Sequence, residues 1–206
     1  MSCWIVTATG AEVDLRRTMA KDISALDIAA ALPKINRFTG HTVRPYSVAE
    51  HSLLVCELAA REFAVKLPQA LLAALLHDAH EAYCGDVSTP AKRVLGWAWT
   101  DLEQPIENTV LQRFGVLRAA RQWASIIKQC DLLALAIERR DLMPAAGVGS
   151  RPWAALEGIQ APGYINLMEG HHVEYTWADW RDLFVERLGE LHYAVHGDSL
   201  HEDQPA

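Results

Sequence analysis

The chain has 206 residues, of which 50% are apolar and 22% charged, and its formal net charge is −7. This balance is typical of one compact globular domain and excludes a disordered chain. The acidic excess argues against binding to nucleic-acid polymers but permits a small phosphate substrate, provided that local cations offset the negative field. No apolar run approaches the roughly 20 residues that cross a bilayer, and the N-terminal sequence has no secretory pattern. The four cysteines form no Cys-x-x-Cys pair, so we expect reduced thiols in a cytoplasmic protein. The lack of a spanning apolar run also predicts that no membrane is a partner.

A β-hairpin is predicted at the N-terminus. Residues 4–7 and 11–15 have the composition of two short strands, and Thr9-Gly10 lies between them as a turn. Residues 1–20 are therefore expected to form a small β extension on a helical body.

Helical spacing of apolar residues dominates the rest of the chain. Asp22 or Ser24 caps the first helix, Ser47 caps the second, and Pro68 opens a third that is deeply apolar. The predicted helices and short helical segments are residues 24–32, 47–59, 69–83, 89–99, 102–114, 122–140 and 176–192.

Breaks between these segments come from Gly and Pro. Gly85-Asp86 ends the third helix, and a Pro- and Gly-rich stretch over residues 144–165 predicts a long loop. The last ten residues are polar, and we expect them to be frayed. The predicted fold is a single all-α domain over residues 1–206 with a small N-terminal β-hairpin.

The most informative stretch places His77 and Asp78 side by side at the polar end of an apolar helix. Adjacent residues of a helix diverge by about 100°, so both can bind one ion only if it lies across the helix edge. Glu81 follows His77 by four residues on the same face, where a carboxylate beside a metal can move protons. Alone, this pair is a weak indication of a metal site.

Two further polar residues interrupt apolar helices. His51 lies within the helix that Ser47 caps, and Asp131 lies in the apolar run over residues 126–135. A buried carboxylate needs a positive partner, so Asp131 either binds a metal or pairs with an Arg or Lys, unless the helix turns it toward water. The residue pattern by itself leaves these alternatives open.

The order His, His-Asp, Asp along three helices resembles the HD superfamily of metal-dependent phosphohydrolases. The segment Ser47–Ser52 is similar to the first-ligand helix of the bacterial 5′-deoxynucleotidases, and Lys128–Asp131 matches their last-ligand region. His77–Glu81 followed by Gly85–Lys92 is closely similar to their HDxxE…GDxxTPxK segment. Phage dATP triphosphohydrolases share these motifs. The resemblance implies a helical HD domain with its metal-binding core in residues 37–140.

This resemblance also implies a cofactor and catalytic residues. It assigns Glu81 as a proton donor or acceptor and Asp86 as a carboxylate that orients water or binds the sugar. Mixed nitrogen and oxygen ligands suit a divalent transition metal such as Co, Mn, Fe, Ni or Zn, and a five- or six-coordinate ion keeps positions open. The implied metal ligands are His51, His77, Asp78 and Asp131.

Substrate contacts are implied on both sides of this core. Arg37 and Lys92 are the expected phosphate contacts, because a guanidinium binds phosphate in a bidentate manner and an ammonium acts as a point charge. Phe38 can pack against sugar or base, but the 5′-deoxynucleotidases carry Trp there, which leaves selectivity for deoxyribose open. The histidines at positions 171 and 172 match no motif.

The expected activity is metal-dependent hydrolysis of phosphate from (deoxy)nucleotides. A 5′-deoxynucleotidase, which converts a dNMP to a deoxynucleoside and phosphate, is favoured over a dNTP triphosphohydrolase that releases triphosphate. A non-catalytic nucleotide-sensing HD domain would lack a ligand or an acidic residue of the motif, and none is missing here. A helical interaction module with structural His and Asp residues is a further alternative. The expected partners are a small-molecule nucleotide and further copies of the chain in a homo-oligomer.

Overall fold

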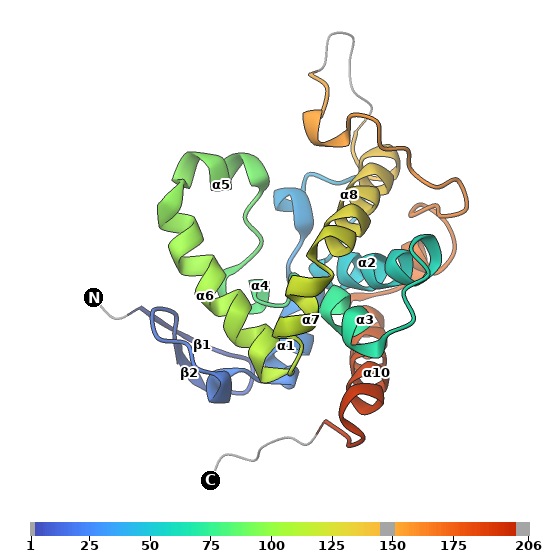
Figure 1. Cartoon of the computed structure of the whole chain (residues 1–206). Helices are drawn as coiled ribbons and strands as arrows, with labels where there is room; N and C mark the ends of the chain where they lie inside the picture. Colours follow the sequence, from blue (N-terminus) through green and yellow to red (C-terminus); the bar gives the residue numbers. More distant parts are fainter. Residues whose placement is uncertain (1–2, 145–150, 201–206) are drawn as a thin grey trace.

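The computed structural model describes residues 3–144 and 151–200, and these are mostly helical (Figure 1). Strand β1 (Trp4–Val6) pairs antiparallel with β2 (Glu12–Asp14), with Ile5 opposite Val13. These elements confirm the prediction of an all-α fold with a small N-terminal hairpin. The hairpin turn is fixed to the helical body through Asp27, which accepts hydrogen bonds from the Thr9 backbone N–H at 2.8 Å and the Thr9 hydroxyl at 3.2 Å.

Ten helices and four short 3₁₀ turns make up the remaining regular structure of the described residues. The helices are α1 (Ala25–Ala31), α2 (Val48–Glu62), α3 (Pro68–Leu75), α4 (Glu81–Cys84), α5 (Thr89–Leu95), α6 (Trp97–Arg113), α7 (Leu117–Gln122), α8 (Ala124–Asp141), α9 (His171–Glu174) and α10 (Trp177–His196). The 3₁₀ turns are η1 (Ala20–Asp22), η2 (Leu32–Lys34), η3 (Arg37–Gly40) and η4 (Ala154–Leu156).

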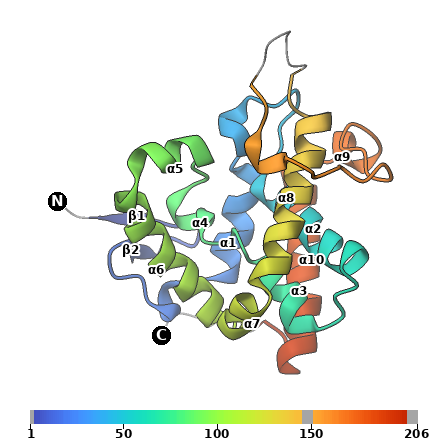
Figure 2. The ribbon, with the colours of Figure 1, turned by 45° about the horizontal axis from the view of Figure 1, so that its top comes forward.

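Helix α2 lies at the centre of the body and packs against α3, α8 and α10 (Figures 1 and 2). Its apolar face buries Leu58, which joins Leu72, Ile137 and Phe184 of these neighbours in the core. Ser47 caps the helix as predicted, because its hydroxyl accepts the Glu50 backbone N–H at 3.2 Å. The burial of α2 on several sides fixes the direction in which each of its polar residues points.

The predicted helix over residues 69–83 is wrong, because α3 ends at Leu75 and residues 76–80 form turns. The His77 ring Nδ1 lies 2.9 Å from the Ala74 carbonyl oxygen, which a continued helix would pair with the Asp78 backbone N–H. The side chain therefore takes the place of a helical hydrogen bond. This break frees His77 and Asp78 from helical geometry, so the expected divergence of their side chains does not apply.

Other boundaries differ by smaller amounts. Helix α6 begins at Trp97 rather than at residue 102, because the break falls at Gly96, whose φ is 62°. The predicted helix over residues 122–140 begins at Ala124, where it follows the separate helix α7, and α10 extends to His196. Within the predicted loop over residues 144–165, residues 151–165 are irregular apart from η4, while 145–150 lie outside the described residues, as do residues 201–206 of the predicted frayed end.

In the part of the chain that the structure describes, no helix combines the length and apolarity needed to cross a membrane.

A buried carboxylate on α2, Glu50, connects this helix to the C-terminal part of the chain. Glu50 is 2% exposed and accepts hydrogen bonds from Arg44 at 2.6 and 2.9 Å, while the His172 ring Nδ1 lies 2.9 Å from its Oε1. Arg44 also donates to the Leu167 carbonyl at 2.9 Å. The segment around α9 is thereby held against the first turn of α2.

Candidate metal centre

His51 is fully buried on α2 and faces Glu138 of α8. The distance from His51 Nδ1 to Glu138 Oε1 is 2.6 Å, so Nδ1 keeps its hydrogen and Nε2, which faces the site, is the nitrogen that the neutral ring offers to a metal. This is the arrangement in which a histidine binds a metal through Nε2.

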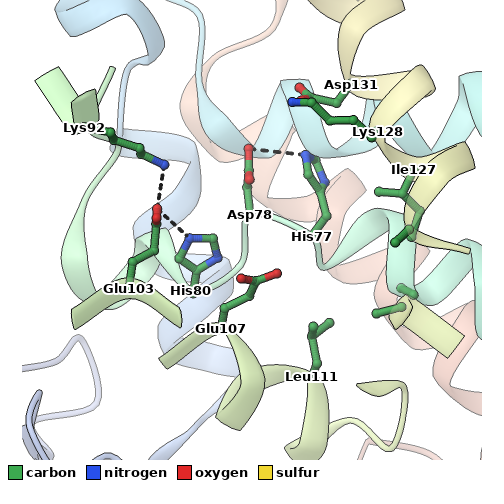
Figure 3. Close-up of a pocket in the computed structure, with 13 residues that line it drawn as sticks. His77, Asp78, His80, Lys92, Glu103, Glu107, Leu111, Ile127, Lys128 and Asp131 are labelled. Atoms are coloured by element: carbon green, nitrogen blue, oxygen red, sulfur yellow. Dashed lines mark hydrogen bonds and ion pairs between the residues drawn. The ribbon is translucent and has the colours of Figure 1, made fainter. Parts of the chain in front are cut away.

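His77 reaches the same place from the turn after α3. Its Nδ1 donates to the Ala74 carbonyl, so Nε2 is the nitrogen that points into the site, 3.3 Å from His51 Nε2. Asp78 Oδ2 lies 3.3 Å from His77 Nε2 and 3.5 Å from His51 Nε2 (Figure 3). His51, His77 and Asp78 each offer a ligand atom within 4.8 Å of the others.

Asp131 lies beside this group without belonging fully to it. Its Oδ1 is 3.5 Å from His51 Nε2, but its Oδ2 accepts a hydrogen bond from Lys128 at 2.7 Å (Figure 3). The two predicted roles of Asp131, a metal ligand and an ion-pair partner, are therefore compatible with this geometry. One oxygen faces His51, and the other forms an ion pair with Lys128. Lys128 is 65% exposed, so moving it away costs little.

The four residues fit a divalent transition metal. Two imidazole Nε2 atoms and two carboxylates face one another here, so a divalent cation could bind all four after displacing the second proton that His51 holds at neutral pH. The pKa values also show that the carboxylates of this cluster favour positive charge beside them. Burial and Arg37 lower the pKa of His51, but Glu138 and Asp131 prevail and raise it to about 9. Although burial opposes its charge, Asp78 has a pKa well below its usual range because His77 and His51 stabilise the carboxylate.

Glu138 is the residue that sequence reasoning missed. It is fully buried, and besides His51 it accepts a hydrogen bond from Arg37 Nη2 at 3.3 Å. Glu138 follows Asp131 by seven residues, which is two helical turns on the same face. A glutamate at that spacing, directly after the apolar residues 132–137, could have indicated this role from the sequence.

Arg37, the expected phosphate contact, is engaged with protein carboxylates. Its Nη1 lies 3.3 Å from Asp78 Oδ2 and its Nη2 lies 3.3 Å from Glu138 Oε2, while its side chain is only 12% exposed. Although burial disfavours the charge, these carboxylates raise the pKa of Arg37 above its ordinary value. A phosphate group that reaches Arg37 must share it with Asp78.

The next two residues have an unusual backbone. Phe38 and Thr39 both adopt φ of 55°, in the left-handed region that residues with a Cβ rarely enter, at a cost of about 1–2 kcal/mol each. The half-buried Phe38 ring lies 6.1 Å from the Trp153 ring between centroids, at an interplanar angle of 37°. This strained turn directs Phe38 away from the core, which contains neither ring.

Glu81 and Asp86 follow the turn over residues 76–80, which carries His77 and Asp78 and is called the HD turn below. Glu81 begins α4, is 2% exposed, and has one oxygen, Oε2, that is buried without a hydrogen-bond partner among the described residues. Burial raises the pKa of Glu81 to about 10, and the charges of Asp78 and Asp86 add to this effect. Burial also raises the pKa of Asp86. Glu81 is therefore protonated at neutral pH in the absence of a cation.

Lys92, the other expected phosphate contact, forms an ion pair with Glu103 of α6. Its Nζ lies 2.5 Å from Glu103 Oε1, which also lies 3.2 Å from His80 Nε2 (Figure 3). Burial opposes the Glu103 charge, but His80 and Lys92 prevail and lower its pKa to about 2. His80, Glu81 and Glu103 offer a second group of ligand atoms within 4.8 Å. In this second group, the Lys92 ammonium already supplies the positive charge that pairs with Glu103.

These side chains line a pocket of about 300 Å³ between the HD turn and helices α6, α7 and α8 (Figure 3). Five of the nine predicted site residues lie in one group of contacts: Arg37, His51, His77, Asp78 and Asp131. Lys92 lines the same pocket as His77, Asp78 and Asp131 but is paired with Glu103. Phe38 lies outside the pocket lining, beside Trp153.

Comparison with known proteins agrees with this geometry. A family model described as an HD domain matches residues 29–115, a range that holds His51, His77 and Asp78. The uncharacterized protein YfdR of Escherichia coli strain K12 is 35% identical over 191 residues, which cover 91% of this chain and 95% of that protein. An uncharacterized protein of Rhodobacter capsulatus is 38% identical over 144 residues, which cover 68% of this chain and 72% of its own length. The HD domain suggests a metal-dependent phosphohydrolase, and it is to the HD-domain family that this chain belongs.

Proposed function

We propose that the protein hydrolyses phosphate from nucleotides in a 5′-deoxynucleotidase-like reaction that converts a dNMP to a deoxynucleoside and phosphate. The observation that carries the proposal is the meeting of the Nε2 atoms of His51 and His77 with the Asp78 carboxylate, beside a buried acid, Glu81. The first group suits a metal, and the second suits proton transfer to a leaving oxygen.

His51, His77, Asp78 and Asp131 would hold the ion, for which Co, Mn, Fe, Ni or Zn are suitable. When bound, such an ion acts as a Lewis acid toward the phosphoryl group. Asp131 completes the set by releasing Lys128 and turning its second oxygen toward the site. Glu138 keeps the His51 ring oriented with Nε2 inward throughout.

The other residues bind the substrate and move protons. Lys92 exchanges Glu103 for a phosphate oxygen, and Arg37 shares its guanidinium between Asp78 and the phosphate. A water molecule, oriented by Asp86, adds to phosphorus as the bond to the 5′ oxygen breaks. Glu81 donates its proton to that leaving oxygen and regains one from the attacking water, so the cycle closes without a further reactant.

The charge of the pocket supports a monophosphate over a triphosphate. Its lining carries Lys92 and Lys128 but four carboxylates, Asp78, Glu103, Glu107 and Asp131. A triphosphate brings more negative charge into this environment than a monophosphate does. The triphosphohydrolase alternative remains on motif grounds, because both activities share the HDxxE and TPxK elements.

The test is an assay of purified protein loaded with Co or Mn against dNMPs, NMPs and dNTPs. Released phosphate and triphosphate are quantified, and the nucleoside product is identified by chromatography. We expect phosphate and deoxynucleoside from dNMPs, and no turnover by Asp78→Asn. Triphosphate release from dNTPs would favour the alternative activity. If stoichiometric metal is bound but no nucleotide is hydrolysed, the chain is a nucleotide-sensing domain instead.

A further inference from the structure

We propose that Trp153 forms, with Phe38, the surface on which the base of the substrate stacks, so that Trp153 is a specificity-determining residue. The inference rests on the proposed function, because it names the part of a nucleotide that lies beyond the phosphate. Trp153 belongs to the irregular segment before η4, which none of the motifs covers.

Two pairs of consecutive residues connect Trp153 to the metal centre. Arg37 and Glu138 point inward, where their side chains form an ion pair at 3.3 Å. Their neighbours Phe38 and Arg139 contact the Trp153 ring, Phe38 at 6.1 Å between centroids and Arg139 with its Cζ 5.2 Å from the centroid. Trp153 therefore lies one residue outward from the groups that hold the site. In a nucleoside monophosphate the base is likewise separated from the phosphate by a single sugar.

The aromatic pair is not explained by core packing. Phe38 and Trp153 are both half-buried, and neither belongs to the hydrophobic core or packs against it. The turn η4, which follows Trp153, packs against α8, and Figure 2 shows η3 next to it. Holding Phe38 there requires two consecutive left-handed residues, Phe38 and Thr39. Strained backbone that positions a half-exposed side chain is typical of ligand-binding sites.

The chemistry of this surface suits a base rather than a second phosphate. Flat aromatic rings stack on the π-face of any nucleobase, and this contact tolerates different bases. The Arg139 guanidinium lies over one face of the indole and adds a second flat group, which also packs on flat rings. We therefore expect Trp153 to distinguish nucleotides from sugar phosphates without choosing strongly among bases.

The experiment compares wild type, Trp153→Ala and Trp153→Phe in the metal-loaded protein. The substrates are 2′-deoxyadenosine 5′-monophosphate and 2-deoxyribose 5-phosphate, which lacks the base. We expect Trp153→Ala to lower kcat/KM for the nucleotide about tenfold to hundredfold, mainly through KM, and to leave the sugar phosphate unchanged. Trp153→Phe should restore most of the loss. The matched control is Trp4→Ala on the hairpin, where the side chain is 47% exposed, and it should behave as wild type.

Two outcomes would overturn the inference. One is an equal loss for both substrates, which indicates a structural role, and the other is no loss for either. Calorimetric binding of 2′-deoxyadenosine 5′-monophosphate to chelator-treated protein separates this inference from the proposed function. If wild type hydrolyses neither substrate, the proposed function fails, but weaker binding by Trp153→Ala still supports the inference. Equal binding by wild type and Trp153→Ala, or no binding by wild type, counts against it.

Discussion

At the scale of single residues, the site depends on which nitrogen of each histidine carries the hydrogen. Glu138 fixes this for His51, and the Ala74 carbonyl fixes it for His77. Both Nε2 atoms are thereby oriented toward the proposed metal position before any ion arrives, which lowers the cost of assembling the site. The motif spacing identified the two histidines, but their partners are a backbone carbonyl and a glutamate two turns along α8, neither of which a short motif contains.

Replacing Glu138 by Gln should weaken metal binding about 10- to 100-fold. The amide keeps the shape of the side chain but not the charge that holds the hydrogen on His51 Nδ1. Calorimetric titration with Co measures the affinity, and thermal denaturation followed by circular dichroism checks that the variant is folded. Glu107→Gln is the matched control, because Glu107 also lines the pocket but stands apart from His51. Equal affinities in the two variants would contradict the role given to Glu138.

At the scale of elements, the fold was predictable where a periodic pattern coincides with a cap. The caps at Ser24 and Ser47 set the starts of α1 and α2 correctly. The end of α3 was not predictable, because residues 69–83 keep a helical composition and the break comes from a side chain of the HD motif itself. The position of Trp153 was also not predictable from the sequence, because its contact with Phe38 joins two irregular segments that are far apart in the chain.

The cap of α2 provides a test at this scale. Ser47→Ala removes the hydroxyl that accepts the Glu50 N–H and should cost about 1 kcal/mol of unfolding free energy. For a chain of this length, that corresponds to a melting temperature lower by about 2–4 °C. Ser88→Ala serves as the control, because Ser88 occupies the N-cap position of α5 but makes no capping hydrogen bond there. Equal melting temperatures for Ser47→Ala and Ser88→Ala would show that the cap contributes little.

At the scale of the whole molecule, the proposed ligands come from α2, the HD turn and α8, and a single core holds these elements together. The acidic residues around the site oppose one another until a cation or protons neutralise them. Glu81 is the clearest case, because its pKa is raised from an ordinary value of 4.5 to about 10. The stability of the metal-free protein therefore depends on pH.

Between those two pKa values, the folded protein holds a proton on Glu81 that the unfolded chain releases. Its contribution to stability is present below pH 4.5 and is lost as pH rises toward 10, at up to about 1.4 kcal/mol per pH unit. Urea unfolding of chelator-treated protein at pH 6 and pH 8 should show a larger loss for wild type than for Glu81→Gln. Glu57→Gln, on a side chain 46% exposed, should follow wild type. Parallel profiles for wild type and Glu81→Gln would refute this assignment.

The anchoring of Glu50 gives the C-terminal region a part in the chemistry although it supplies no ligand. Glu50 precedes His51 on α2, and one of its hydrogen-bond partners, His172, comes from beyond residue 165. Removing that partner, or the Leu167 carbonyl that steadies Arg44, would leave a partly unneutralised acid one residue from the imidazole. Shortened forms of the chain that retain every motif residue should therefore bind the ion poorly, because the proposed metal site depends on residues beyond the segment that the motifs cover.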